Sequence, residues 1–246
     1  MFGEVRSSMR QLEGKIAIVT GASSGIGKGI AEAFSKEGAK LVIAARNQEK
    51  LDVAADELRS LGTVVLSVPT DVSQEVQVIA LFEKTMQEFG RLDILVNNAG
   101  IYEEAALEET SLEVWQRTLN INLTGPFLCT REAMKIMKRQ GGGRIINIGS
   151  IAAQMPRQNA VSYNCSKIGL VALTKTTALE GRSFGVVASC LHPGNVATAQ
   201  MGESKEPMML VGDLVKAVVT IATLPLHVNM LEAIVLPVVQ PYLGRG

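Results

Sequence analysis

The sequence predicts an α/β fold in which a doubly wound parallel sheet carries helices on both faces. Two observations predict this fold: short apolar runs without polar alternation recur along the chain, and longer amphipathic segments separate them. Such runs are typical of strands buried on both faces. Their alternation with helices implies right-handed crossovers in a parallel sheet. No linker, repeat or low-complexity tract interrupts the pattern, so we expect a single domain over residues 1–246.

Seven short apolar segments are expected to form the strands. They are residues 15–20, 40–45, 63–68, 92–97, 144–149, 186–192 and 230–238. Apolar residues at helical spacing predict helices at 25–37, 74–89, 111–139 and 212–223. Ligands of such sheets bind beyond the carboxyl ends of the strands, so we look for the site in the loops that follow them.

Composition and charge exclude several classes of partner. Among 246 residues, 24 Lys and Arg balance 24 Asp and Glu, so nothing favours nucleic acid or an anionic membrane surface.

The three cysteines match neither a disulfide framework nor a metal site, and we expect small buried apolar residues at Cys129, Cys165 and Cys190. No signal-peptide core is visible, so we expect a cytoplasmic protein with a flexible N-terminal arm at 1–13, and Met9 as an alternative start to Met1.

A glycine-rich loop follows the first expected strand. The stretch "TGASSGIG" (20–27) places Gly21 for a tight turn, Gly25 for close approach to a diphosphate and Gly27 for helix–strand packing. The unpaired N–H groups at the start of the following helix favour an anion. The loop therefore predicts a dinucleotide site.

The end of the second expected strand indicates which dinucleotide binds. An NAD site has an acidic residue there for the ribose 2′-hydroxyl, but the stretch "LVIAARN" ends in Arg46 without a carboxylate. A guanidinium suits a 2′-phosphate. We expect NADP(H) to be preferred, with NAD(H) as the alternative.

Tyr163 and Lys167 in "YNCSK" are one helical turn apart and share a face. A phenol with a pKa near ~10 exchanges protons inefficiently at neutral pH, and an adjacent ammonium favours the phenolate. The pair is therefore a candidate acid/base for proton delivery to a carbonyl oxygen.

The motifs jointly resemble those of the short-chain dehydrogenase/reductase family. They are "TGASSGIG" (20–27), "NNAG" (97–100), "NIGS" (147–150), "YNCSK" (163–167) and "HPGNVAT" (192–198). The resemblance implies a Rossmann-type fold and interconversion of a carbonyl and an alcohol with a nicotinamide cofactor. It assigns substrate binding to Ser150, acid/base catalysis to Tyr163, and a ribose contact to Lys167. Asn122 matches the asparagine that holds a water, with Asn120 as its rival.

The resemblance also implies the cofactor contacts. They are Gly21, Ser23, Ser24, Gly25, Ile26, Gly27, Asp71, Val72, Asn98, Ala99, Gly100, Tyr163, Lys167, Pro193, Gly194, Val196 and Thr198. For Asp71, which matches an adenine-binding acid, a helix cap is the alternative. His192 and His227 match no family position, and we expect surface or packed residues there. Family dimers and tetramers pair helices that match 111–139 and 160–182, so we expect a homo-oligomer.

The substrate is expected to contact residues 101–106, 153–159 and 199–211. The chain departs from the ketoacyl reductases at "MLEAIVLPVVQP" (230–241), and residues 224–240 look more like members that act on small hydroxy acids or ketones. Arg157 is either a clamp for a substrate carboxylate or an exposed loop residue. A non-catalytic dinucleotide sensor is the alternative function.

Overall fold

The computed structural model describes residues 10–198 and 206–242, which are built around one large parallel sheet. Its strands are β1 (Ile16–Thr20), β2 (Lys40–Ala45), β3 (Val65–Pro69), β4 (Ile94–Asn97), β5 (Gly143–Ile148), β6 (Val186–Pro193) and β9 (Glu232–Val235). Their order across the sheet is β3-β2-β1-β4-β5-β6-β9, and all neighbours are parallel. The predicted doubly wound, seven-stranded sheet is confirmed.

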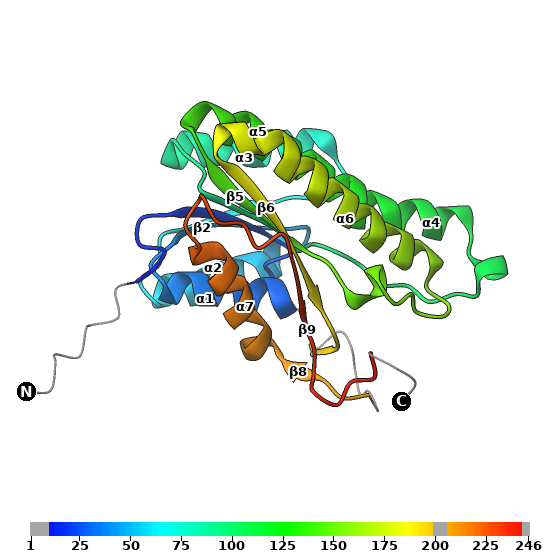
Figure 1. Ribbon diagram of the computed structural model, residues 1–246. Coiled ribbons are helices and arrows are strands. Elements are labelled where there is room, and N and C mark those ends of the chain that lie inside the picture. The colour runs from blue at the N-terminus through cyan, green and yellow to red at the C-terminus, as the bar shows by residue number, and fades with distance from the viewer. Residues whose placement is uncertain (1–9, 199–205, 243–246) are drawn as a thin grey trace, which may run out of the picture.

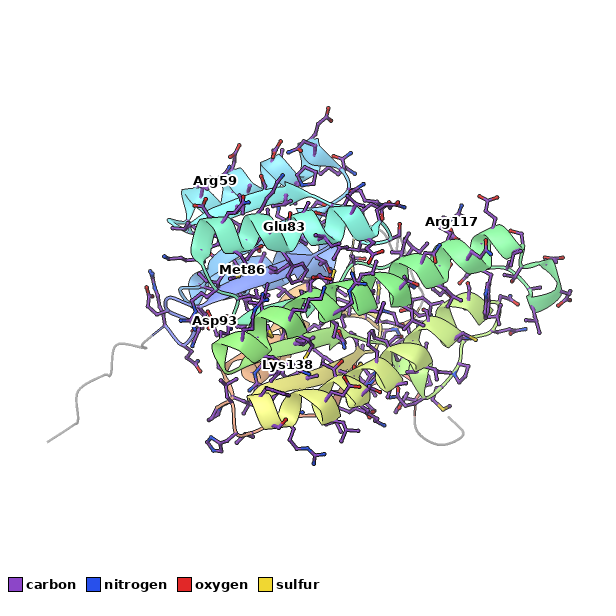
Figure 2. All side chains as sticks on the ribbon, turned by 90° about the horizontal axis from the view of Figure 1, so that it is seen from above. Arg59, Glu83, Met86, Asp93, Arg117 and Lys138 are labelled. Carbon is purple, nitrogen blue, oxygen red and sulfur yellow. The ribbon has the colours of Figure 1, made fainter. Side chains whose placement is uncertain are left out.

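Helices cover both faces of the sheet (Figure 1). One face carries α3 (Glu75–Phe89), α4 (Leu112–Leu119), α5 (Gly125–Gln140) and α6 (Val161–Gly181), and the other carries α1 (Gly25–Lys36), α2 (Gln48–Ser60) and α7 (Val211–Thr223). Seen from above in Figure 2, α3, α5 and α6 lie side by side, and α4 extends beyond the sheet. None of the described helices is long and apolar enough to cross a membrane.

Two helical features depart from the sequence prediction. The helix α2 was not predicted, although Asn47 caps it and its buried residues fall at helical spacing. The predicted helix 111–139 is interrupted by a π-helical turn, Asn120–Thr124, between α4 and α5. Single π-turns inside helices are frequent at functional sites, and this one contains Asn122.

Two segments that were expected to be irregular, the N-terminal arm and the substrate loop, contain ordered structure. Residues 10–13 of the expected arm form a turn, in which Leu12 is buried and its N–H donates to the Glu37 carbonyl at 2.9 Å. Residues 1–9 lie outside the described residues. The expected substrate loop at 199–211 ends in a short strand, β8 (Met209–Leu210), which pairs with β7 (Val196–Ala197), and residues 199–205 lie outside the described residues.

Apolar side chains fill both helix–sheet interfaces, and a polar cluster lies among them near the carboxyl ends of the central strands. The Asn97 amide donates to Asn147 Oδ1 at 2.8 Å and to Thr130 at 3.1 Å, and Asn147 donates to Thr174 at 2.8 Å. All four residues are buried. The cluster thus ties β4 and β5 to α5 and α6 just below the site.

Of the three cysteines, only Cys165 departs from the expectation, because it is exposed.

Candidate active site

The glycine loop lies between β1 and α1 with the geometry that its spacing predicts. Gly21 and Gly25 have φ values of 66° and 56°, in the left-handed region that glycine tolerates best. A Cβ atom on Gly27 would lie 2.3 Å from the Gly21 carbonyl oxygen, so only glycine permits this approach. The loop is therefore compact, and the start of α1 offers its N–H groups beside the ends of the strands.

Thr20 joins this loop to the end of β4, a role that sequence reasoning missed. Its hydroxyl donates to the Val96 carbonyl at 3.2 Å and accepts from the N–H groups of Asn98 and Ala99 at 3.0 and 3.1 Å. The Asn98 side chain donates in return to the Thr20 and Gly21 carbonyls at 2.9 and 3.3 Å. A threonine at the end of a strand, directly before the first glycine, was the available signal.

Arg46 lies one residue beyond β2, the strand adjacent to β1. Its side chain is exposed, and the Ala22 N–H in the glycine loop donates to the Ala44 carbonyl at 3.3 Å. The end of β2 thus lies directly beside the glycine loop. This position suits a guanidinium that reaches the ribose end of a dinucleotide.

Asp71 and Val72 lie in the loop between β3 and α3. Asp71 Oδ1 accepts from the N–H and the hydroxyl of Ser73 at 3.0 and 2.7 Å, so its carboxylate organises the turn before α3. Val72 is buried, and a Cβ atom on Gly125 would lie 2.7 Å from it. This contact places the start of α5 against the loop.

Lys167 and Tyr163 face the end of β5 from α6. The Lys167 ammonium is buried and donates to the Ile148 carbonyl at 2.9 Å. It also lies 5.5 Å from the centre of the Tyr163 ring. The predicted shared helical face is therefore observed, and the cation is held against the sheet beside the phenol.

Ser150 follows β5 by two residues and is also buried. Its Oγ accepts from the Ala152 N–H at 3.1 Å, as the cap of a short 3₁₀ turn. That bond occupies a lone pair and leaves the hydroxyl proton for donation to an oxygen in the cleft.

Asn122 turns its side chain toward the loop after β4. Its amide donates to the Ile101 carbonyl and accepts from the Ile101 N–H, each at 2.8 Å, and it donates to Ser166 at 3.3 Å. The π-helical turn aims this side chain, and Ser166 in turn donates to the Tyr163 carbonyl at 2.7 Å. Asn120 makes none of these contacts, so the structure favours Asn122 over its rival as the residue beside α6.

Tyr102 packs against Tyr163, an arrangement that the sequence did not reveal. The two rings meet edge to face, with centroids 5.0 Å apart and planes at 89°. Partial burial, followed by the Glu104 carboxylate that accepts from its hydroxyl at 2.7 Å, raises the pKa of Tyr102 to about 12. Tyr102 therefore stays protonated at neutral pH.

The segment after β6 returns to the glycine loop. A Cβ atom on Gly25 would lie 3.6 Å from the Thr198 methyl group, and one on Gly194 would lie 2.1 Å from Gln240 Oε1. Pro193 and Val196 are buried. The segment thus lies directly beside the glycine loop.

His192 is a packed residue behind Ser150. Its ring is fully buried, and Nδ1 lies 2.9 Å from the Ser150 carbonyl oxygen, which requires Nδ1 to carry the proton. Nε2 lies 3.7 Å from the Glu232 carboxylate, too far for a hydrogen bond. Burial lowers the pKa of His192, so the ring is neutral at pH 7 and orients the Ser150 backbone.

Comparison with known proteins decides the family. The family model described as short chain dehydrogenase matches residues 15–209.

The chain belongs to the short-chain dehydrogenase/reductase family.

Individual relatives agree with this assignment. A 3-oxoacyl-[acyl-carrier-protein] reductase of Synechocystis sp. is 40% identical over 191 residues, which are 77% of each chain. Glucose 1-dehydrogenase 2 of Bacillus subtilis is 39% identical over 203 residues, covering 80% of this chain and 78% of that protein. A crystal structure of a short-chain type dehydrogenase/reductase from Mycobacterium marinum superposes with a TM-score of 0.86 at 32% identity, over 92% of this chain and 96% of that one.

This short-chain dehydrogenase is therefore an oxidoreductase of a family that uses NAD(P)(H). Its residues fit such a group, because the glycine loop leaves no room for Cβ atoms at Gly21 and Gly27 and opens onto a helix N-terminus. The structure brings Asn122, Ser150, Tyr163 and Lys167 together where the loop after β4, the end of β5 and α6 meet. The Lys167 ammonium lies beside the Tyr163 ring, and Ser150 follows two residues after the Ile148 carbonyl that this ammonium binds.

The buried neutral His192 predicts a pH dependence of stability. Because its pKa is lowered in the folded protein, the unfolded chain binds a proton more readily below about pH 6.5. The free energy of unfolding should therefore fall as the pH drops from about 6.5 to 5, by up to about 1.4 kcal/mol per pH unit. Urea unfolding of His192→Gln should lose this part of the slope, whereas exposed His227→Gln should keep it. Equal slopes for the wild type and His192→Gln would contradict the assignment.

Proposed function

We propose that the protein is an NADP(H)-dependent oxidoreductase that interconverts a carbonyl and a secondary alcohol, with Tyr163 as the general acid/base. The observation that carries the proposal is the buried Lys167 ammonium, held by the Ile148 carbonyl at 2.9 Å and lying 5.5 Å from the Tyr163 ring. A cation in this position stabilises a phenolate, which is the form that Tyr163 takes after it gives up its proton.

Each of the four residues has a distinct task. A bound nicotinamide cofactor would supply the hydride, and Tyr163 would give its proton to the carbonyl oxygen of the substrate. Ser150 would donate its hydroxyl proton to the same oxygen; the Ala152 N–H occupies one of its two lone pairs and leaves that proton available. Lys167 binds the ribose hydroxyls and stabilises the phenolate. Asn122 holds the Ile101 backbone against α6 and supports the water position that the family resemblance implies.

We assign the cofactor contacts as the sequence motifs predict them. Gly21–Gly27 and the start of α1 would hold the diphosphate, and Arg46 would bind a 2′-phosphate. Asp71 and Val72 would contact the adenine, and Asn98–Gly100 would contact its ribose. Pro193, Gly194, Val196 and Thr198 would hold the nicotinamide. Thr198 lies against Gly25, which supports a shared role of these two loops in holding the cofactor.

A non-catalytic dinucleotide sensor is less well supported, because all four catalytic candidates are present and Lys167 lies beside both Tyr163 and the end of β5, two residues before Ser150. As an enzyme, the protein would act on either a ketoacyl group or a small hydroxy acid. The names of the two relatives above give different substrates, a 3-oxoacyl-[acyl-carrier-protein] and glucose. The relatives therefore support the reaction type more than the substrate.

We further propose that the protein is a homodimer or homotetramer. Apolar side chains are exposed on the outer faces of α4, α5 and α6, including Leu112, Phe127, Ile168 and Leu179. These helices pack against one another, and apolar residues exposed on neighbouring helices would need covering in an oligomer.

Light scattering tests the assembly. The wild type should have the mass of a dimer or tetramer, and Ile168→Asp on α6 should shift it toward the monomer because the charge would be buried unpaired. Val53 is similarly exposed on α2, and Val53→Asp should leave the mass unchanged. A monomeric wild type would refute the proposal.

Substitution of Tyr163 tests the mechanism. Tyr163→Phe keeps the ring and removes the proton donor, so kcat with NADPH and a reducible ketone should fall by about 10²–10⁴-fold. Tyr242→Phe, a matched change near the C-terminal end of the described residues, should leave kcat unchanged. A kcat of Tyr163→Phe above a tenth of the wild-type value would contradict the proposed mechanism.

Substitution of Arg46 tests the cofactor preference. Arg46→Ala should raise the KM for NADPH by about 10–100-fold, the effect of losing a charge-assisted hydrogen bond, and leave that for NADH unchanged. The control is Arg59→Ala on α2, labelled in Figure 2, where the guanidinium pairs with Asp56. Better efficiency of the wild type with NADH than with NADPH would overturn the preference.

A further inference from the structure

A cavity lies at the edge of the sheet where the strands begin. Its volume is about 310 Å³, and its lining comes from the starts of β1, β4 and β5, the loop before β5 and the end of α7. Asp93 in this lining, labelled in Figure 2, directly precedes β4. Arg144, also in the lining, is four residues, or about 13 Å of strand, from Ile148 at the other end of β5. The cavity is therefore separate from the candidate active site.

Arg144 is a buried cation beside this cavity, and its residue is 1% exposed. Side chains alternate along a strand, so Arg144 shares the face of Ile146 and Ile148, which pack with residues of α1 and α7. Its Nη2 donates to the carbonyls of Leu224 and Pro225 at 2.8 and 3.2 Å, and both of these residues line the cavity. The guanidinium is therefore held at the end of α7, where the cavity lies.

The rest of this guanidinium has no partner. Nε and Nη1 of Arg144 are buried and make no hydrogen bond to any residue that the structure describes. Burial lowers the pKa of Arg144, and no carboxylate of the described residues opposes this effect. The group still carries its charge at neutral pH. A buried charge without a counter-ion is costly, and unpartnered buried donors point to a bound water or ion.

The other charged groups of the cavity leave its charge positive. Among the described residues that line it, three are cations, Lys15, Arg91 and Arg144, and only Asp93 is an anion, so the net charge is +2. The Asp93 carboxylate is already engaged, since Arg91 donates to its two oxygens at 2.6 and 3.1 Å and the Ile16 N–H donates to Oδ2 at 2.9 Å. Lys15 lies 3.8 Å from this carboxylate and is half exposed. None of the described contacts joins Asp93 to the Arg144 guanidinium.

We propose that this cavity binds a phosphate dianion, with the free donors of Arg144 as its buried anchor and Lys15 and Arg91 at its mouth. The charge of the dianion matches the net charge of the lining, whereas a carboxylate would leave one positive charge unbalanced. Arginine is the side chain best suited to phosphate, because it is always charged and presents several N–H donors. The volume falls at the lower end of the range for small-molecule pockets.

Calorimetric titration with inorganic phosphate tests the site, in chloride buffer of constant ionic strength at about pH 8, where phosphate is a dianion. The wild type should bind phosphate with a Kd of about 1 mM or below. Acetate should bind at least about tenfold more weakly, because it carries one charge. Arg144→Met keeps an apolar stem and removes the donors, so it should raise the Kd for phosphate at least about tenfold.

A second variant and its control guard against a general loss of stability. Lys15→Gln, at the exposed mouth, serves if Arg144→Met perturbs the fold, and it should raise the Kd about two- to fivefold. Lys84→Gln is the matched control, since Lys84 is exposed on α3, which covers the other face of the sheet. It should leave the Kd unchanged.

Three results would overturn the inference. Without saturable binding at about ten times the expected Kd, Arg144 would be a structural residue that only tethers the end of α7. Loss of binding in Arg46→Met but not in Arg144→Met or Lys15→Gln would place the phosphate at the dinucleotide loop. Equal affinity for acetate and phosphate would contradict a site for a dianion. None of these measurements depends on turnover, so the inference and the proposed function are tested separately.

Discussion

The hydrogen bond from the Lys167 ammonium to the Ile148 carbonyl oxygen sets the geometry of the site. A buried ammonium requires polar partners, and this one finds its partner at the last residue of β5. The bond joins α6 to the end of β5, and Tyr163 lies one turn earlier on the same helix. Ser150 follows two residues after Ile148, where the bond from His192 to its carbonyl holds it from behind.

Polar groups at the carboxyl ends of the strands support this arrangement from below. Thr20 and Asn98 join the glycine loop to the end of β4, and Asn97 and Asn147 join β4 and β5 to the helices above them. A buried hydrogen bond stabilises modestly when made but costs more when one partner is lost. Such a network therefore specifies one geometry for the strand ends, and this geometry positions the candidate catalytic residues that follow those strands.

The strands and most helices were predictable because their signals are local. Apolar runs of the right length define buried strands, and glycine spacing defines the first loop. The helix α2 carries an equally local signal in its Asn47 cap, although it was not among the predicted helices. The π-helical turn at Asn122 was not predictable from spacing, since a helical pattern in 111–139 does not reveal where one extra residue enters a turn. The pairing of β7 with β8 joins segments on either side of 199–205 and carries no sequence signal of its own.

The sequence by itself determined the fold class, the family motifs and the identities of the four candidate catalytic residues, because each rests on periodicity or on short fixed spacings. Only the tertiary structure decided that Tyr102 packs on Tyr163 and that Arg157 is countered by Glu206 through Asn195. These residues come from three loops that follow different strands, and a charge is free or neutralised only according to what the fold places beside it. The family motifs are therefore local features of the chain, whereas the surroundings of Tyr163 and Arg157 arise from long-range packing.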